Sequence, residues 1–198
     1  MNSASADTVC DTSGKVSFSV LRRYSWADLV FFFLIYSMIG WIYETVLEVV
    51  IYQSGFTNRG ILFGPWLPVY GFGAVLFLLL WYRLVYGASL MRKLALIPVI
   101  FLLTALTATA VELPTSYILE WVNGSFPWDY TEFAMDFEGR IAVNPSVRFG
   151  LGGVLFLYVI QPLLDKARAA LGKVRMRWIA VTILCVLACD CAYCFFLR

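Results

Sequence analysis

The chain has 198 residues, of which 61% are hydrophobic and 14% are charged, and its formal net charge is +2. Its mean hydropathy of +0.79 is higher than a soluble domain of this size needs, so composition argues against a soluble protein. Histidine is absent, which removes the commonest metal ligand and the commonest proton carrier at neutral pH. Zinc hydrolases and triad enzymes are therefore disfavoured, and neither a metal nor another cofactor is expected.

The first 24 residues are polar and rich in Ser, Thr and Asp, and they lack the apolar segment of a secretory signal. We interpret residues 1–24 as a mobile cytoplasmic tail and residues 25–198 as a single transmembrane domain. Ser25 and Asp28 have the spacing of a capping pair, which places the start of the first helix there.

Long apolar segments follow, and a helix needs about twenty such residues to cross a hydrocarbon layer roughly 30 Å thick. The predicted fold is all-α, a polytopic bundle of about five transmembrane helices. The predicted spans cover residues 26–52, 66–85, 94–121, 149–164 and 178–197.

Lys and Arg are unevenly divided between the two sides that five spans define. The tail and the second and fourth connections hold eleven of them, and the other side holds four. Short cytoplasmic loops retain Lys and Arg, so we predict a cytoplasmic amino terminus and a carboxyl terminus outside. This rule explains the basic fourth connection, although contact with anionic lipid of the inner leaflet is an alternative.

The first predicted helix carries a polar stripe near its outer end. Spacings of three and four residues place its members on one helix face: Ser37, Trp41, Glu44, Glu48 and Tyr52. An ionised side chain at the membrane centre costs roughly 2.5–3.5 kcal/mol on insertion scales, so this stripe is not expected to face lipid.

The third predicted helix repeats the pattern with Thr109, Glu112, Ser116 and Glu120, and Pro114 is expected to kink it. Both helices run in the same direction, so four carboxyl groups reach one depth. The arginines available to neutralise them are Arg59, Arg140 and Arg148. Two interpretations of the cluster are compatible with each other. It is a structural charge network, or it is a site that binds a polar substrate or carries protons.

Two connections on the predicted outer side deserve separate interpretations. Residues 53–65 are rich in Gly and Pro and contain Asn58 beside Arg59, which favours a re-entrant loop or a capped turn with proline opening the next helix. Residues 122–147 hold Asp129 and Tyr130 among aromatic residues that are typical of anchors at the membrane interface.

The last predicted helix contains Asp190 and four cysteines. Cysteine behaves as a small apolar residue in a membrane helix, and these four are spread over more than one face, so we expect a structural role. Asp190 is expected to face the bundle.

Motifs between residues 36 and 162 resemble the CmpB-like family of bacterial membrane proteins, described as type IV ABC transporter permeases. The matching residues are Gly40-Trp41-x-x-Glu44, Asn58-Arg59-Gly60-x-Leu62-x-Gly64-Pro65-x-x-Pro68-x-Tyr70-Gly71, Glu112 with Glu120, Trp128-Asp129-Tyr130, Gly139-Arg140-Ile141, and Ser146 with Gly150. The chain departs from the family pattern at Pro127, Thr131 and Arg148-Phe149, and the added Arg148 alters the charge balance of the outer cluster.

The resemblance implies a multi-pass, permease-like component of the bacterial cytoplasmic membrane, surrounded by the lipid bilayer. The 198 residues contain no Gly-x4-Gly-Lys-Ser/Thr loop, so any ATP would be bound by a separate ATPase subunit. Another membrane partner is the alternative, and no nucleic-acid partner is expected.

The leading hypothesis is a membrane transport component whose outer-facing Glu/Arg cluster contacts a polar or charged solute. The alternatives are a membrane enzyme acting on a lipid-linked or phosphorylated substrate at the outer interface, and a non-catalytic scaffold or regulator. An enzyme is the less favoured of these, because no nucleophile motif is recognisable. The candidate residues are Glu44, Glu48, Asn58, Arg59, Glu112, Glu120, Asp129, Tyr130, Arg140 and Arg148.

Overall fold

The computed structural model of the protein describes residues 23–53, 55, 56, 58, 60, 62–126 and 128–194. This part of the chain is mostly helical. It contains four helices that are long and apolar enough to cross a membrane: Trp26–Ile51, Pro68–Val85, Leu90–Val122 and Val143–Ala192. The protein is therefore a multi-pass membrane protein with an all-α spanning region, whereas the predicted tail lies almost entirely outside the described residues.

Helix α2 (Trp26–Val46) begins at a capping box formed by Ser25 and Asp28. The Asp28 carboxylate accepts a hydrogen bond from the Ser25 backbone N–H at 2.8 Å, and Ser25 Oγ accepts one from the Asp28 N–H at 3.3 Å. The predicted capping pair is confirmed. After Val46 the helix widens into a π-helical turn, η1 (Leu47–Ile51), in which Glu48 is buried.

Helix α3 (Pro68–Val85) begins with proline at its first position, where the missing N–H removes no helical hydrogen bond. Helix α4 (Leu90–Asn123) begins four residues before the predicted boundary at 94, and it contains Pro98 and Pro114. It ends at Gly124, whose φ of +76° belongs to the left-handed region that commonly terminates helices.

A short antiparallel hairpin follows α4, with β1 (Asp136–Phe137) paired to β2 (Ile141–Ala142). Helical structure then resumes at once and runs through α5 (Val143–Leu155), the π-helical turn η2 (Phe156–Ile160) and α6 (Gln161–Ala192). It thus begins six residues before the predicted boundary at 149 and continues through the predicted break after 164.

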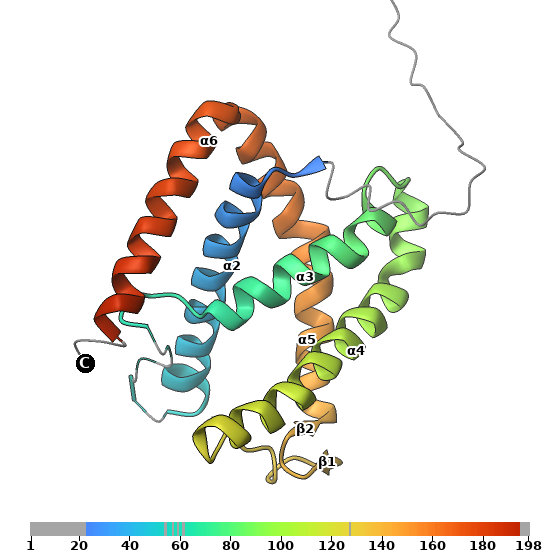
Figure 1. Ribbon diagram of the computed structural model, residues 1–198. Coiled ribbons are helices and arrows are strands. Elements are labelled where there is room, and N and C mark those ends of the chain that lie inside the picture. The colour runs from blue at the N-terminus through green and yellow to red at the C-terminus, as the bar shows by residue number, and fades with distance from the viewer. Residues whose placement is uncertain are drawn as a thin grey trace, which may run out of the picture.

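Gly172 interrupts α6, because its φ of +74° and ψ of 162° are not helical. At the top of Figure 1 the ribbon of α6 turns over and its second half descends beside α2. Residues 165–177, which the sequence predicted as a connection, are therefore helical except for a sharp turn at Gly172 between two helical arms.

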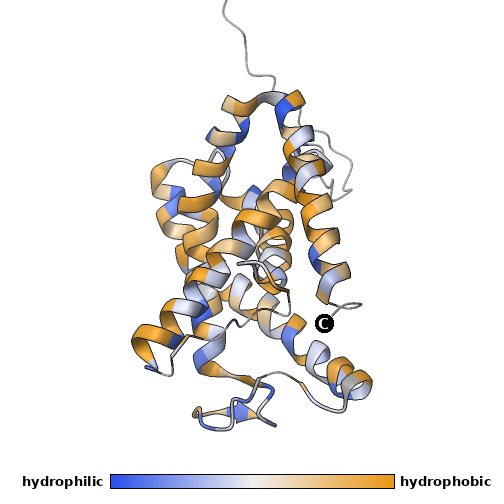
Figure 2. Cartoon of the chain, turned by 90° about the vertical axis from the view of Figure 1, so that its left-hand side faces the viewer, coloured by the Kyte–Doolittle hydropathy of each residue, from blue (hydrophilic) through white to orange (hydrophobic). Residues whose placement is uncertain are grey.

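The helices pack in a bundle with two distinct ends (Figure 1). Helix α2 contacts α3 and α6, α4 contacts α3 and α5, and α3 also contacts η2. We call the end with the start of α2, the α3–α4 connection and Gly172 the turn end. The opposite end, where α4 and η1 finish and where β1 and β2 lie, is the hairpin end. Figure 2 shows largely hydrophobic helices and hydrophilic residues in the hairpin.

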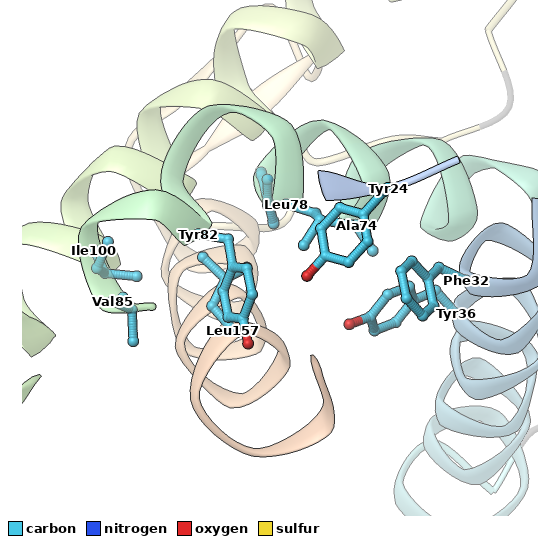
Figure 3. Packing of buried hydrophobic residues seen from close by; sticks show 10 residues of the cluster. Tyr24, Phe32, Tyr36, Ala74, Leu78, Tyr82, Val85, Ile100 and Leu157 are labelled. Atoms are coloured by element: carbon cyan, nitrogen blue, oxygen red, sulfur yellow. The ribbon is translucent and has the colours of Figure 1, made fainter. Parts of the chain in front are cut away.

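Aromatic and aliphatic side chains from α2, α3, α4 and η2 form the main core (Figure 3). Phe32, Tyr36, Leu78 and Leu157 are almost completely buried there. Close contact between α4 and α5 relies on Gly150 and Gly153 instead, because small residues let membrane helices approach each other.

Candidate functional site

The four predicted glutamates lie toward the hairpin end, on α2 with η1 and on α4. Glu112 and Glu120 are separated by eight residues, which corresponds to about 12 Å along a helix. Glu112 therefore lies deeper in the bundle than Glu120, and the two glutamates contact different partners.

Glu112 uses only one of its carboxyl oxygens. Its Oε1 accepts a hydrogen bond from the Tyr130 hydroxyl at 2.8 Å. Its Oε2 is buried and has no hydrogen-bond partner among the described residues. A buried carboxyl oxygen without a partner is costly, so this atom can accept a hydrogen bond from a bound group or carry a proton.

Glu44 on α2 accepts a short hydrogen bond from the hydroxyl of Tyr70, which lies in the first turn of α3. The Tyr70 ring also packs edge-on against the Tyr43 ring, with 6.2 Å between centroids. The Tyr70 hydroxyl thus ties the Glu44 carboxyl of α2 to the first turn of α3.

Tyr130 donates a hydrogen bond to Glu112 and lies within electrostatic range of Glu44. Burial raises the pKa of its hydroxyl, and the negative charges of Glu112 and then Glu44 raise it further, while Arg148 lowers it. Tyr130 therefore stays protonated at neutral pH and donates to Glu112, with Glu44 and Arg148 close enough to influence it electrostatically.

Arg148 on α5 lies at the edge of this group. Its Nη1 donates to the Tyr52 hydroxyl at 3.0 Å, and its guanidinium lies 5.7 Å from the centre of the Phe133 ring. It makes no ion pair with a described carboxylate, so its charge is available to a bound group. We define the Glu44–Glu112 cluster as Glu44, Tyr70, Glu112, Tyr130 and Arg148.

Arg140 belongs to a separate and closed network. Its guanidinium pairs with Glu120 through Nη2 and with Glu138 through Nε at 3.2 Å, and its Nη1 donates to Ser116 Oγ at 3.3 Å. The hydrogen bond that Arg140 donates to the Glu120 carboxylate raises the pKa of Arg140, which stays charged. The Trp128 indole donates to the Arg140 carbonyl at 2.9 Å.

Two aromatic rings cover the same guanidinium, with ring centres 4.1 Å away for Tyr117 and 4.6 Å away for Phe126. All three guanidinium nitrogens of Arg140 have partners and the residue is buried, so little of it is free for a ligand. The Arg140 half of the predicted cluster is thus paired within the protein, and a purely structural role for it stays a prediction.

Asp129 positions its neighbour Tyr130. Its Oδ1 accepts the Thr131 backbone N–H at 3.0 Å, and this hydrogen bond lowers the pKa of the carboxyl. The Tyr130 N–H donates to the Gly139 carbonyl at 2.9 Å. Gly139 has φ of +66°, and a Cβ there would lie only 3.0 Å from Asp129 Oδ1, so the loop requires glycine at this position.

Asn58 organises the connection before α3. Its side-chain oxygen accepts the Trp41 indole N–H at 3.0 Å, and its amide donates to the Leu62 and Phe63 carbonyls. Asn58 is exposed and contacts other residues of the same connection, whereas Arg59 falls outside the described residues.

Asp190 also holds this connection. Its carboxylate accepts the backbone N–H groups of Phe63 and Gly64 and the Trp66 indole N–H, at 2.9, 3.0 and 2.9 Å. Its expected position facing the bundle is thereby explained. Cys185, Cys189 and Cys191 form no disulfide among the described residues, and the Cys194 thiol donates to Asp190 Oδ1 at 3.5 Å. No group of three or more metal-ligating side chains occurs in the described part of the chain.

One polar centre, around Asp165, was not predicted from the sequence. Asp165 accepts hydrogen bonds from the hydroxyls of Tyr24 at 2.9 Å and Tyr82 at 3.0 Å, and from the Gln161 amide at 3.2 Å. Asp165 lies just beyond the fourth predicted span, which ends at residue 164. The spacing of four residues from Gln161 is a signal that could have assigned it to the helix.

Tyr70 is the other missed partner. It lies in the motif that carried the family resemblance, but no spacing rule relates it to Glu44, because the two residues are on different helices.

Comparison with protein-family models matches residues 31–195 to the family described as "Putative ABC-transporter type IV". No curated protein and no solved structure matches the chain.

Proposed function

The chain belongs to the type IV ABC-transporter family, and from this premise we propose that it is a membrane-embedded transport component that binds its solute at the Glu44–Glu112 cluster. The observation that carries this proposal is the buried Oε2 of Glu112, which has no partner among the described residues. Ionisable groups within membrane-spanning segments often mark the path of a substrate or proton.

The charges of the cluster favour a particular kind of solute. The cluster contains two carboxyl groups, from Glu44 and Glu112, and one guanidinium, from Arg148, and the hydroxyls of Tyr70 and Tyr130 are already used as donors. A solute with a protonated amine would supply the donor that Glu112 lacks. An acceptor group on the same solute would pair with Arg148.

We propose five crossings, with the amino terminus in the cytoplasm of a bacterium and the carboxyl terminus outside. The reversal at Gly172 supports this, because it divides Val143–Ala192 into two arms. In this orientation the hairpin end and the Glu44–Glu112 cluster face outward. Energy from ATP would come from a separate ATPase subunit at the turn end.

The test is binding of small solutes to the purified full chain, measured by calorimetry with methylammonium, putrescine, betaine and phosphate. We expect an amine to bind and Glu112→Gln to weaken it about ten- to a hundredfold, because a hydrogen bond to a charged group contributes roughly 1.5–3 kcal/mol. The matched control is Glu132→Gln, since Glu132 is exposed in the same loop.

Thermal unfolding of both variants separates binding from folding. The proposal is wrong if phosphate alone binds, if Glu132→Gln weakens the amine as much, or if Glu112→Gln unfolds the protein without changing the affinity of what remains folded.

A further inference from the structure

A cavity of about 320 Å³ lies at the turn end of the bundle. The residues around it come from the segment that precedes α2, the end of α3 and the connection after it, the start of α4, η2 and α6. Three of its lining side chains are cationic: Arg23, Lys93 and Lys166. Its volume is at the lower end of the roughly 300–1,000 Å³ range of small-molecule sites.

The protein neutralises these cations only in part, through one ion pair between Arg23 and Asp165 among the described residues. Asp165 is the acid that lines the cavity in the described part of the chain, and the Tyr24, Tyr82 and Gln161 side chains already donate to it. No ion pair or hydrogen bond joins the Lys93 or Lys166 side chain to a described residue.

Arg23 is held in place beside the cavity. Its guanidinium lies 3.5 Å from the centre of the Tyr86 ring and 3.5 Å from Asp165. Its buried Nε has no partner among the described residues. The cavity is therefore cationic overall and retains unused donors, which favours an anionic ligand.

A second hollow of about 500 Å³ is an apolar groove between α4 and the α5–η2 segment. Ile97, Phe101, Leu151 and Leu155 are among the side chains that line it. Leu151 and Leu155 are at least half exposed, so the groove opens on the surface that faces lipid.

Tyr158 lines both hollows and joins them. Its hydroxyl donates to the Lys93 carbonyl at 2.8 Å. Lys93, Ile97 and Phe101 follow one another at intervals of four residues on α4, so the lining changes from cationic to apolar about 6 Å deeper in the membrane. This order matches a phospholipid, in which a charged headgroup is joined to acyl chains.

We propose that the two hollows form one site for an anionic glycerophospholipid. Its phosphate lies in the cavity among Arg23, Lys93 and Lys166, and an acyl chain lies in the groove of α4, α5 and η2. Basic pockets between transmembrane helices bind anionic headgroups at the cytoplasmic side, which is where the turn end lies in our proposed orientation. A free phosphate would use the cavity alone.

The test is native mass spectrometry of the full chain in detergent with phosphatidylglycerol, phosphatidylcholine or glycerol 3-phosphate. We expect preferential retention of phosphatidylglycerol. The double variant Lys93→Gln/Lys166→Gln should lower its affinity about fivefold for each lysine, the loss expected for about 1 kcal/mol per cation. The control Lys173→Gln/Arg175→Gln removes two exposed cations that do not line the cavity.

A third variant, Leu151→Trp, fills the groove from its exposed side and should weaken the lipid while leaving glycerol 3-phosphate unaffected. Equal retention of phosphatidylcholine, or an equal loss in the control pair, would overturn the site. Displacement of the lipid by an equal concentration of glycerol 3-phosphate would show that a soluble phosphate is the ligand, and the lipid assignment would be wrong.

Discussion

Asp190 joins the second arm of α6 to the connection that precedes α3. Three donors converge on this one carboxylate, and two of them are backbone N–H groups of adjacent residues, Phe63 and Gly64. The third donor is the Trp66 indole. Such groups have few other partners near a membrane, so Asp190 contributes to holding residues 63–66 against α6.

We expect Asp190→Ala to lower the free energy of unfolding by about 1–3 kcal/mol, because it removes the acceptor of three donors, two of which are partly buried. Asp190→Asn should lose less, since its amide oxygen can still accept. The measurement is denaturant unfolding in detergent micelles, followed by tryptophan fluorescence. Cys189→Ala, an exposed neighbour, is the control. Unchanged stability of Asp190→Ala would show that the connection is held by other contacts.

At this scale the sequence identified residue types better than residue partners. Glu44 and Glu112 were recognised because acids are rare in apolar helices, and Arg140 and Arg148 because cations are rare on the predicted outer side. Hydropathy gives no information on which arginine meets which acid. Arg140 takes Glu120 because both lie near the hairpin, whereas Arg148 starts a different helix and reaches Tyr52.

The contact between α4 and α5 depends on glycines at a spacing of three residues. A Cβ at Gly150 would lie 2.7 Å from the Phe101 ring, and one at Gly153 would overlap the Thr104 side chain. Gly152 lies between them on the same helix, and a Cβ there would meet no atom within 4 Å. Gly152 is therefore a control position for the close packing at Gly150 and Gly153.

We expect Gly153→Ala to destabilise the protein by about 1–3 kcal/mol, since the added methyl group must displace Thr104 or separate the helices. Gly152→Ala should be neutral or stabilise by up to about 1 kcal/mol, because alanine favours helix more than glycine does. Thermal unfolding in detergent compares the two. Equal effects at both positions would mean that α4 and α5 are not closely packed.

Helix starts with a local signal were predicted well, as at Ser25 and Asp28. Helix boundaries without a local signal were predicted several residues away from their positions in the structure. For example, α5 begins at Val143, immediately after the β2 strand, and not at residue 149. The turn at Gly172 was placed within a basic connection of thirteen residues, yet helical hydrogen bonding continues up to it. Charged residues shorten the apolar segment that hydropathy detects, but they do not end a helix.

The whole molecule has a charge asymmetry that runs along the bundle. Residues 83–93 and 166–177 carry eight of the Lys and Arg residues and belong to the turn end. The hairpin end has Arg140, which is neutralised, and Arg148. This difference is the basis for a cytoplasmic turn end, and Lys173 is the position that distinguishes five crossings from four.

We predict that cysteines introduced at Ser89 and Lys173 react only with a reagent on the cytoplasmic side, and one at Glu132 only with a reagent outside. All three positions are exposed, and the native cysteines would be replaced by alanine. Labelling of cells with an impermeant maleimide, before and after lysis, makes the comparison. An unreactive Lys173→Cys, or one labelled from outside, would contradict five crossings.

Hydropathy, caps and motifs are local properties of the chain, and they were enough to identify a membrane protein, its approximate helices, its family and its unusual acids. Only the tertiary structure divided those acids between a closed Arg140 network and the Glu44–Glu112 cluster. It alone brought Tyr70, Tyr130 and Asp165 to their partners and placed a cationic cavity beside an apolar groove. These features depend on contacts between helices far apart in the chain, and no local pattern records such distances.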